Sequence, residues 1–187
     1  MATFTELQAY YRILHEAFIK EKESYHFNHD RSHNATVMQF MFDNSTEINM
    51  FCGQLSVLRE DFYNHITEDS TSIKEAVINS LNKYLEHKDS KFSIIIEDYS
   101  DDIFKNLICK DLFTRKIKEG QIRLYQLNED FSFKEDINHF CYTDTKITRF
   151  EEDKTQHSAI CIFHNEKYYS LMKKNFNILL SIAKEIN

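Results

Sequence analysis

HFCYTDTKITRFE, residues 139–151, is the stretch from which the fold of this chain can be worked out. Side chains on both sides of Asp144 alternate between two faces with the two-residue period of β-strands. An Asp side chain can hydrogen-bond the backbone two residues further on, which makes Asp144 a good start for a tight turn. The stretch therefore predicts a β-hairpin with His139 and Cys141 on one face and Phe140 on the other.

Strand and helix patterns alternate on both sides of this hairpin. Downstream, the apolar run at residues 158–163 predicts a strand covered on both faces, and residues 166–186 have the apolar spacing of a helix. Upstream, the same criteria predict helices at 72–87 and 101–118 and strands at 48–55, 91–97 and 121–127. Such alternation is typical of an α/β fold with parallel strand pairs, to which the hairpin adds antiparallel ones. We expect one mixed, mostly parallel sheet flanked by helices.

The N-terminal segment begins with a capping box formed by Thr3 and Glu6, which predicts a helix immediately after it. This helix carries a narrow apolar seam made of Phe4, Leu7, Tyr11, Leu14 and Phe18. The seam has two interpretations, which are packing on the core of the same chain or contact with a partner. We predict an N-terminal helical extension over residues 1–47 and an α/β domain over residues 48–187, with the seam as a candidate interface.

Three histidines follow this helix in a polar stretch. His26, His29 and His33 would share one face if a helix continued through them, and three imidazoles can bind a metal ion. The surrounding Asn, Asp and Ser residues are typical of a polar connector instead. These histidines are therefore weak candidates for metal ligands, and no metal or other cofactor is expected.

Composition excludes several classes of protein. The 187 residues suit one domain, and the formal net charge of −7 argues against a broad nucleic-acid surface, which needs a surplus of basic side chains. With 2 glycines and no proline, the chain has no Gly-rich phosphate loop or nucleophile elbow. Gly53 within a predicted strand indicates a bulge or a close backbone approach, and Gly120 is expected to end a helix.

The cellular compartment is predicted from features that are missing. The 4 cysteines are widely spaced, as is typical of buried thiols in a reducing cytosol. No apolar run approaches the roughly 20 residues of a membrane helix, and the first residues have no signal-peptide pattern. We expect a cytoplasmic protein without a membrane segment.

The order of elements from residue 48 onwards resembles one half of the phospholipase D-like fold. In active members of that superfamily, the histidine of an H-x-K-x4-D motif lies on the strand that begins such a hairpin. Here His139 occupies the histidine place, Cys141 the lysine place and Lys146 the aspartate place. The chain is more similar to the branch that lacks the motif. The residues that carry this similarity are His139-Phe140, Asp144, Arg149-Phe150-Glu151, Ala159, Phe163, Asn165, Phe176 and Leu179.

The resemblance implies a particular chemistry, from which this sequence departs. In the active enzymes one histidine attacks a phosphodiester, a second copy of the motif supplies the general acid, and lysine holds the phosphate oxygens. Cys141 cannot supply that charge, and removing one positioned donor from a reacting oxyanion lowers the rate about 10²–10³-fold. We therefore expect His139 to be structural and the domain to be non-catalytic.

Two catalytic alternatives stay open. The first is a divergent phosphodiesterase or nuclease that uses His139 together with His157 or His164. The second is a Cys–His nucleophile formed by Cys141 and His139, whose positions two apart on a strand do not guarantee a hydrogen bond.

The preferred hypothesis is an interaction or accessory subunit of a bacterial protein assembly, such as a defence system. Half-domains of the phospholipase D-like fold tend to pair. We therefore expect a homodimer or a complex with another protein, and no association with a membrane.

Overall fold

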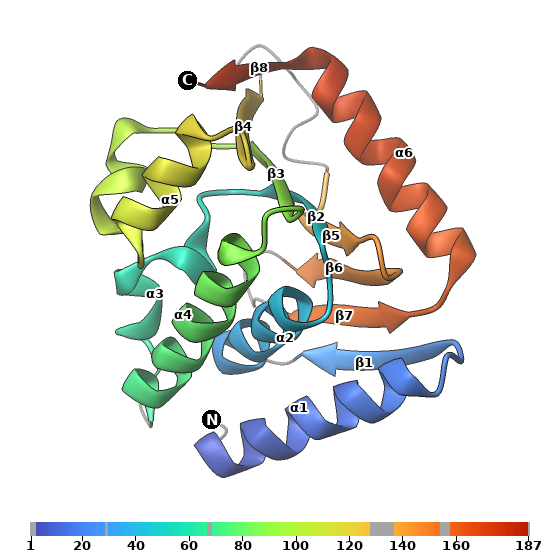
Figure 1. The fold of residues 1–187 in the computed structure, drawn as a ribbon. Coiled ribbons are helices and arrows are strands. Elements are labelled where there is room, and N and C mark those ends of the chain that lie inside the picture. Colours follow the sequence, from blue (N-terminus) through green and yellow to red (C-terminus); the bar gives the residue numbers. More distant parts are fainter. Residues whose placement is uncertain (1–2, 29, 67–68, 128–136, 154–157, 187) are drawn as a thin grey trace.

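The structure is a computed structural model that describes residues 3–28, 30–66, 69–127, 137–153 and 158–186. One mixed sheet with helices on both faces makes up the fold (Figure 1). The elements in chain order are α1 (Phe4–Ile19), β1 (Ser24–Asn28), α2 (Arg31–Asp43), β2 (Glu47–Cys52), the 3-10 helix η1 (Ser56–Leu58), α3 (Glu60–Tyr63), α4 (Ser70–Glu86), β3 (Lys91–Ile96), the 3-10 helix η2 (Asp101–Asn106), α5 (Lys110–Lys118), β4 (Ile122–Leu127), β5 (Phe140–Thr143), β6 (Ile147–Asp153), β7 (Ser158–Phe163), α6 (Glu166–Ile182) and β8 (Ala183–Ile186).

The sheet has eight strands in the order β1-β7-β6-β5-β2-β3-β4-β8. Only β2–β3 and β3–β4 pair in parallel, and the other neighbours pair antiparallel. The predicted α/β class and the mixed sheet are confirmed, but parallel pairs are fewer than the sequence led us to expect. Antiparallel pairs predominate because β5 pairs antiparallel with β2 and the hairpin and β7 extend the sheet in the same way, to which the edge strands β1 and β8 each add one more antiparallel pair.

An apolar layer lies on each face of the sheet, between the strands and the helices that cover that face. Helices α1 to α5 cover one face and α6 covers the other (Figure 1). Phe92, Ile94 and Ile96 of β3 pack with the first group, whereas Ile95 packs beneath α6. Burial on both faces explains why β3 has a continuous apolar sequence instead of an alternating one.

The hairpin forms as predicted. Cys141 pairs with Arg149 across β5 and β6, and the Lys146 amide donates to the Thr143 carbonyl at 3.1 Å to close the turn. The Asp144 carboxylate accepts hydrogen bonds from the backbone amide and the hydroxyl of Thr46, at 3.0 and 2.6 Å. Asp144 thus ties the turn to the start of β2, a long-range role that its position in a turn does not reveal.

Residues 1–47 contribute more than a helical extension. Residues 24–28 form β1, which pairs with β7 from Ser24 opposite Phe163 to Asn28 opposite Ala159. Helix α2 inserts Val37, Phe40 and Met41 into the core, where none of them is exposed. The sequence indicated a polar connector here and missed this strand, because five alternating residues in a polar stretch are too few to distinguish a strand from a loop.

The seam of α1 is turned toward the chain's own core. Leu7 and Leu14 are buried, and Phe4, Tyr11 and Phe18 are partly buried against the same apolar cluster. Phe18 and Tyr11 both pack edge-on to Phe40 of α2, with ring centroids 5.8 and 5.2 Å apart. The seam therefore packs on the chain's own core, and its role as an interface with a partner stays a prediction.

Helix ends account for the other differences. The last predicted helix stops at Ile182, and residues 183–186 form β8. The stretch 101–118 is divided into η2 and α5, while Gly120 ends α5 with φ +74°, as predicted. In the part of the chain that the structure describes, no helix has both the length and the apolar character needed to cross a bilayer.

Candidate functional site

The candidate site lies at one end of the sheet, where four strands bring polar groups together. Gly53 directly follows β2 and Glu97 directly follows β3, so both lie at the carboxyl ends of parallel strands. His139 precedes β5, and because β5 runs antiparallel to β2, its start lies at the same end of the sheet. Glu151 reaches this end from β6, where its backbone amide donates to the His139 carbonyl at 2.9 Å.

The His139 ring is held between two buried carboxylates. Its Nδ1 lies 2.7 Å from an oxygen of Glu151, and its Nε2 lies 2.6 Å from an oxygen of Glu97. The side chains of His139, Glu151 and Glu97 are only 17%, 8% and 6% exposed. An ionised carboxylate can only accept hydrogen bonds, so two ionised glutamates require both ring nitrogens to carry protons. This arrangement leaves neither nitrogen with a lone pair for attack on a substrate.

Arg149 completes a cluster of four ionisable groups. Its Nη2 lies 3.6 Å from the second oxygen of Glu151, and its Nε and Nη2 donate to the Asn34 side-chain oxygen at 3.2 and 2.9 Å. The two carboxylates thus lie against one guanidinium and one imidazole ring. Buried charges are tolerated when they are paired and hydrogen-bonded, and this cluster meets both conditions. We call Glu97, His139, Glu151 and Arg149 the ion cluster.

A buried hydrogen-bonded chain joins the ion cluster to the N-terminal segment. The side-chain amide of Asn28 on β1 donates to Asn34 at 3.2 Å, and the Tyr10 hydroxyl on α1 donates to Asn28 at 2.6 Å. Asn28 and Asn34 are 1% and 3% exposed. Burial raises the pKa of Tyr10, so its hydroxyl stays protonated as a donor. Residues 1–47 therefore help to build the site.

A cavity of about 130 Å³ lies beside the ion cluster. His139, Arg149 and Glu151 are among its polar lining residues, and most of the other lining residues are apolar. Gly53 has a specific role there, because a Cβ atom at this position would lie 3.1 Å from His139 Cε1. The predicted close approach at Gly53 is thus observed, and the close neighbour is the histidine ring. Leu55, in the loop that follows, is buried with φ +58°, which is a strained conformation for a bulky side chain.

The residues in the lysine and aspartate places of the family motif do not supply its chemistry. Cys141 is buried, and burial raises the pKa of its thiol to about 12, so it is a neutral group beside Arg149. Lys146 is half-exposed and forms an ion pair with Glu166 at 2.6 Å. Because Lys146 follows the turn at the opposite end of the hairpin, it lies far from His139.

Of the two candidate partners of His139, the structure describes His164 but not His157. His164 follows β7, stacks on Phe18 and hydrogen-bonds the Phe18 carbonyl through Nε2 at 2.9 Å. Residue 163 pairs with residue 147, at the far end of β6 from Glu151, so His164 and His139 are separated by about 13 Å of strand. They do not meet within one chain. His157 lies outside the described residues.

The histidines considered as metal ligands do not share a helix face. His26 is on β1 and packs edge-on to Phe163, whereas His33 is on α2 and bonds the Asp30 carboxylate at 2.8 Å. His29 lies outside the described residues. Among the residues with a described placement, no group of three or more His, Cys, Asp or Glu side chains is arranged to hold a metal ion.

Two important residues of the site were not singled out from the sequence. Glu97 was recognised only as the end of an apolar strand, and Asn34 only as part of a polar connector. A carboxylate directly after a buried parallel strand was a usable signal for Glu97, because ligand and active sites form at the carboxyl ends of such strands. Asn34 had no local signal, since its importance depends on Arg149, which is 115 positions away.

Comparisons with known proteins place the fold among solved structures. No family model and no curated protein matches the sequence. TrmBL2, described as an archaeal chromatin protein with a novel mode of DNA binding, matches with a TM-score of 0.60 and 14% identity, over 97% of this chain and 64% of that one. This chain thus spans a little under two thirds of that protein's length.

Two further matches span nearly the whole of the compared chains. Nuc from Salmonella typhimurium, a phospholipase D family member, has a TM-score of 0.55 and 10% identity, over 89% of this chain and 99% of its own. NucT from Helicobacter pylori has a TM-score of 0.54 and 10% identity, over 88% and 99%. The chain therefore has a fold similar to that of phospholipase D family proteins, as the sequence predicted.

Proposed function

We propose that this chain is a non-catalytic phospholipase D-like protein that works as an interaction or accessory subunit of a protein assembly. The ion cluster is the single observation that carries this proposal. A histidine nucleophile needs a free lone pair, and both nitrogens of His139 are already engaged by Glu97 and Glu151. The same holds if one glutamate carries the proton, because each ring nitrogen still faces a carboxyl oxygen.

Charge balance supports the same conclusion. A phosphodiester brings a negative charge, and a site that binds it needs positive charge or hydrogen-bond donors to spare. Arg149 is directed at Asn34 and Glu151, and Cys141 is neutral. A phosphate at this position would lie beside the carboxyl groups of Glu97 and Glu151.

A protein partner fits this chain better than DNA. TrmBL2, which shares the fold, binds DNA, but the formal charge of −7 on this chain works against binding that depends on displaced counterions. We expect no retention of labelled duplex DNA at low salt in a mobility-shift experiment. Binding that weakens steeply with added salt would favour DNA as the partner.

The subunit proposal is tested by light scattering on the purified full chain, followed by affinity capture from native extract. The expected result is a stable complex of fixed stoichiometry, either with a second copy or with a different protein. A chain that stays monomeric and captures nothing, but hydrolyses phosphodiesters, would support the alternative enzyme that uses His139. A homodimer would require a further test of whether the His139 surfaces of the two copies face each other.

A further inference from the structure

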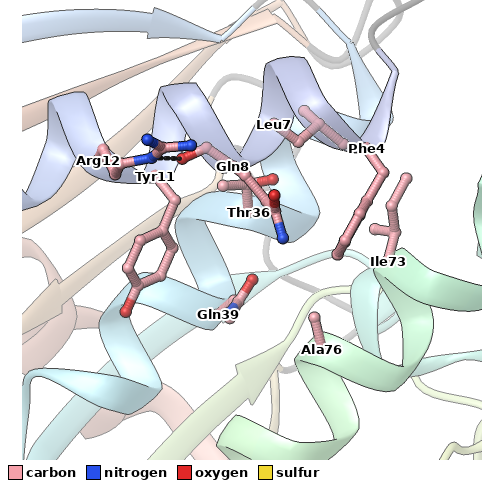
Figure 2. Close-up of a pocket in the computed structure, with 9 residues that line it drawn as sticks. All are labelled: Phe4, Leu7, Gln8, Tyr11, Arg12, Thr36, Gln39, Ile73 and Ala76. Carbon is pink, nitrogen blue, oxygen red and sulfur yellow. Dashed lines mark hydrogen bonds between the residues drawn. The ribbon is translucent and has the colours of Figure 1, made fainter.

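A groove of about 380 Å³ runs between α1, α2 and α4, on the outer side of the helical layer (Figure 2). Nine residues line it, and those from α1 run from Phe4 to Arg12. Eight helical steps of 1.5 Å give this wall a length of about 12 Å. The volume lies in the range of about 300–1,000 Å³ that is usual for small-molecule sites. Its volume is smaller than that of a two-turn helix, which is about 11 Å long and 10 Å across with its side chains.

The lining changes from apolar to polar along the groove. Figure 2 shows Phe4, Ile73 and Ala76 together at one end and Arg12 at the other. Gln8 from α1 and Gln39 from α2 lie between these ends. A ligand that matches this lining has an apolar body and one polar head.

Arg12 favours a ligand whose polar head is an anion. Of the described residues that line the groove, Arg12 alone is charged, in a chain that is acidic as a whole. Its Nε donates to the Gln8 carbonyl at 3.4 Å, and it forms no ion pair within the described ranges. The nearby Glu16 is 3.8 Å from Lys20 and is thereby engaged elsewhere.

The two glutamines add neutral donors to this charge. Their side-chain amides make no hydrogen bond to any residue that the structure describes, so both can turn toward a ligand. One guanidinium with two amides suits a singly charged carboxylate, whereas a phosphate dianion is normally held by more positive charge. Asp43 is not among the residues that line the groove, and its carboxylate accepts the hydrogen bond of Tyr11 at 2.7 Å.

We infer that this groove binds a small amphipathic carboxylate, with its acid group on Arg12 and its hydrocarbon body against Phe4, Ile73 and Ala76. An eight-carbon chain is of the right order of length for the groove. The inference is independent of the ion cluster, which lies at the carboxyl ends of β2 and β3. A result that contradicts this inference would therefore leave the proposed function unaffected, and the reverse also holds.

Titration of the full-length chain with sodium octanoate, followed by two-dimensional amide NMR, tests the inference. We expect saturable shifts confined to residues of α1, α2 and α4. Replacement Arg12→Gln should weaken octanoate binding about tenfold, which is the usual effect of losing one charge-assisted hydrogen bond. The same variant should leave 1-octanol binding unchanged, because the alcohol has no charge. Arg115→Gln, which removes an exposed cation from α5, is the matched control.

A second variant fills the apolar end of the groove. Ala76→Leu should weaken octanoate and octanol alike, provided that its unfolding temperature matches the wild type. Absence of saturable binding below millimolar octanoate would overturn the inference. Equal weakening of octanoate binding by Arg12→Gln and Arg115→Gln would also overturn it, since the anion would then be responding only to the overall charge.

Discussion

Replacement of His139 should lower the free energy of unfolding more than the other single substitutions considered below. His139→Ala removes the cation between Glu97 and Glu151 and leaves two buried carboxylates close together. Breaking a buried ion pair in this way costs about 3–5 kcal/mol. We expect a loss of that size in the free energy of unfolding by urea. His15→Ala, an exposed histidine on α1, should change it by less than about 0.5 kcal/mol.

A double variant separates the charge effect from the loss of packing. His139→Gln with Glu97→Gln removes one positive and one negative charge together, so the pair should be less destabilised than the sum of the two single variants. A double variant that is as unstable as that sum would mean that the two side chains do not interact. The ion cluster would then be an incorrect description of the site.

A substitution at Gly53 tests how much space there is beside the His139 ring. A methyl group there would lie 3.1 Å from His139 Cε1, so the ring or the β2 end must move by a few tenths of an ångström. We expect Gly53→Ala to lower the free energy of unfolding by about 1 kcal/mol, which is the lower end of overpacking costs. The His139 ring resonances should shift in the same variant. An unchanged or increased stability with unshifted His139 signals would contradict the close approach.

At the scale of single elements, Asp30 controls the start of α2. Its carboxylate accepts from the His33 backbone amide at 3.0 Å and from the Ser32 hydroxyl at 2.6 Å. Burial raises the pKa of Asp30, but the hydrogen bonds from His33 and Ser32 outweigh it and hold that pKa well below its usual range. A carboxyl with a depressed folded-state pKa stabilises the fold above its unfolded value of about 3.9, and this contribution is lost as the pH falls below it.

The prediction for Asp30→Ala has both a size and a pH dependence. At pH 7 the variant should lose about 1 kcal/mol of unfolding free energy, as is usual for a helix N-cap. The difference from the wild type should shrink as the pH falls below about 4, because Asp30 of the unfolded chain then binds a proton while the native carboxylate, with its depressed pKa, stays ionised. Urea unfolding across this range measures it, with the exposed Asp89→Ala as the control. A difference that does not change with pH would show that the carboxylate charge is irrelevant.

The N-terminal elements are expected to be inseparable from the sheet. Without residues 1–47, β7 loses its neighbour β1, and the core loses the fully buried Phe40 and Met41 of α2. A chain of residues 48–187 should therefore show no cooperative thermal unfolding by circular dichroism. A sharp transition within a few degrees of that of the full chain would show instead that residues 48–187 fold as an independent domain.

Local sequence patterns were sufficient for the central elements and insufficient for the edges. The strand 158–163 was predicted to the residue, because its apolar run is short and bounded by polar residues. Strands β1 and β8 were missed, since a five-residue polar stretch and the end of an amphipathic helix carry no distinctive period. Edge strands form because a neighbour offers free backbone groups, and that is a property of the assembled sheet.

At the scale of the whole molecule, the site depends on contacts between distant parts of the chain. His139 and the hairpin could be located from sequence, whereas Glu97 is 42 positions from His139 and Asn34 is 115 from Arg149. Their meeting is decided by the strand order β6-β5-β2-β3, which no local pattern encodes. The sequence alone was enough to identify Cys141 in the place of the lysine of the phospholipase D-like motif. The cluster of charged groups around the histidine could be found only in the structure.

The most direct measurement is hydrolysis of bis(p-nitrophenyl) phosphate and of plasmid DNA by the full chain, beside an active phospholipase D-family nuclease. We expect no turnover above buffer for the wild type, because His139 has no free nitrogen. The double variant His139→Gln with Glu97→Gln should give the same result while still folded. Wild-type turnover that this folded variant loses would contradict the proposal and would identify His139 as a catalytic residue.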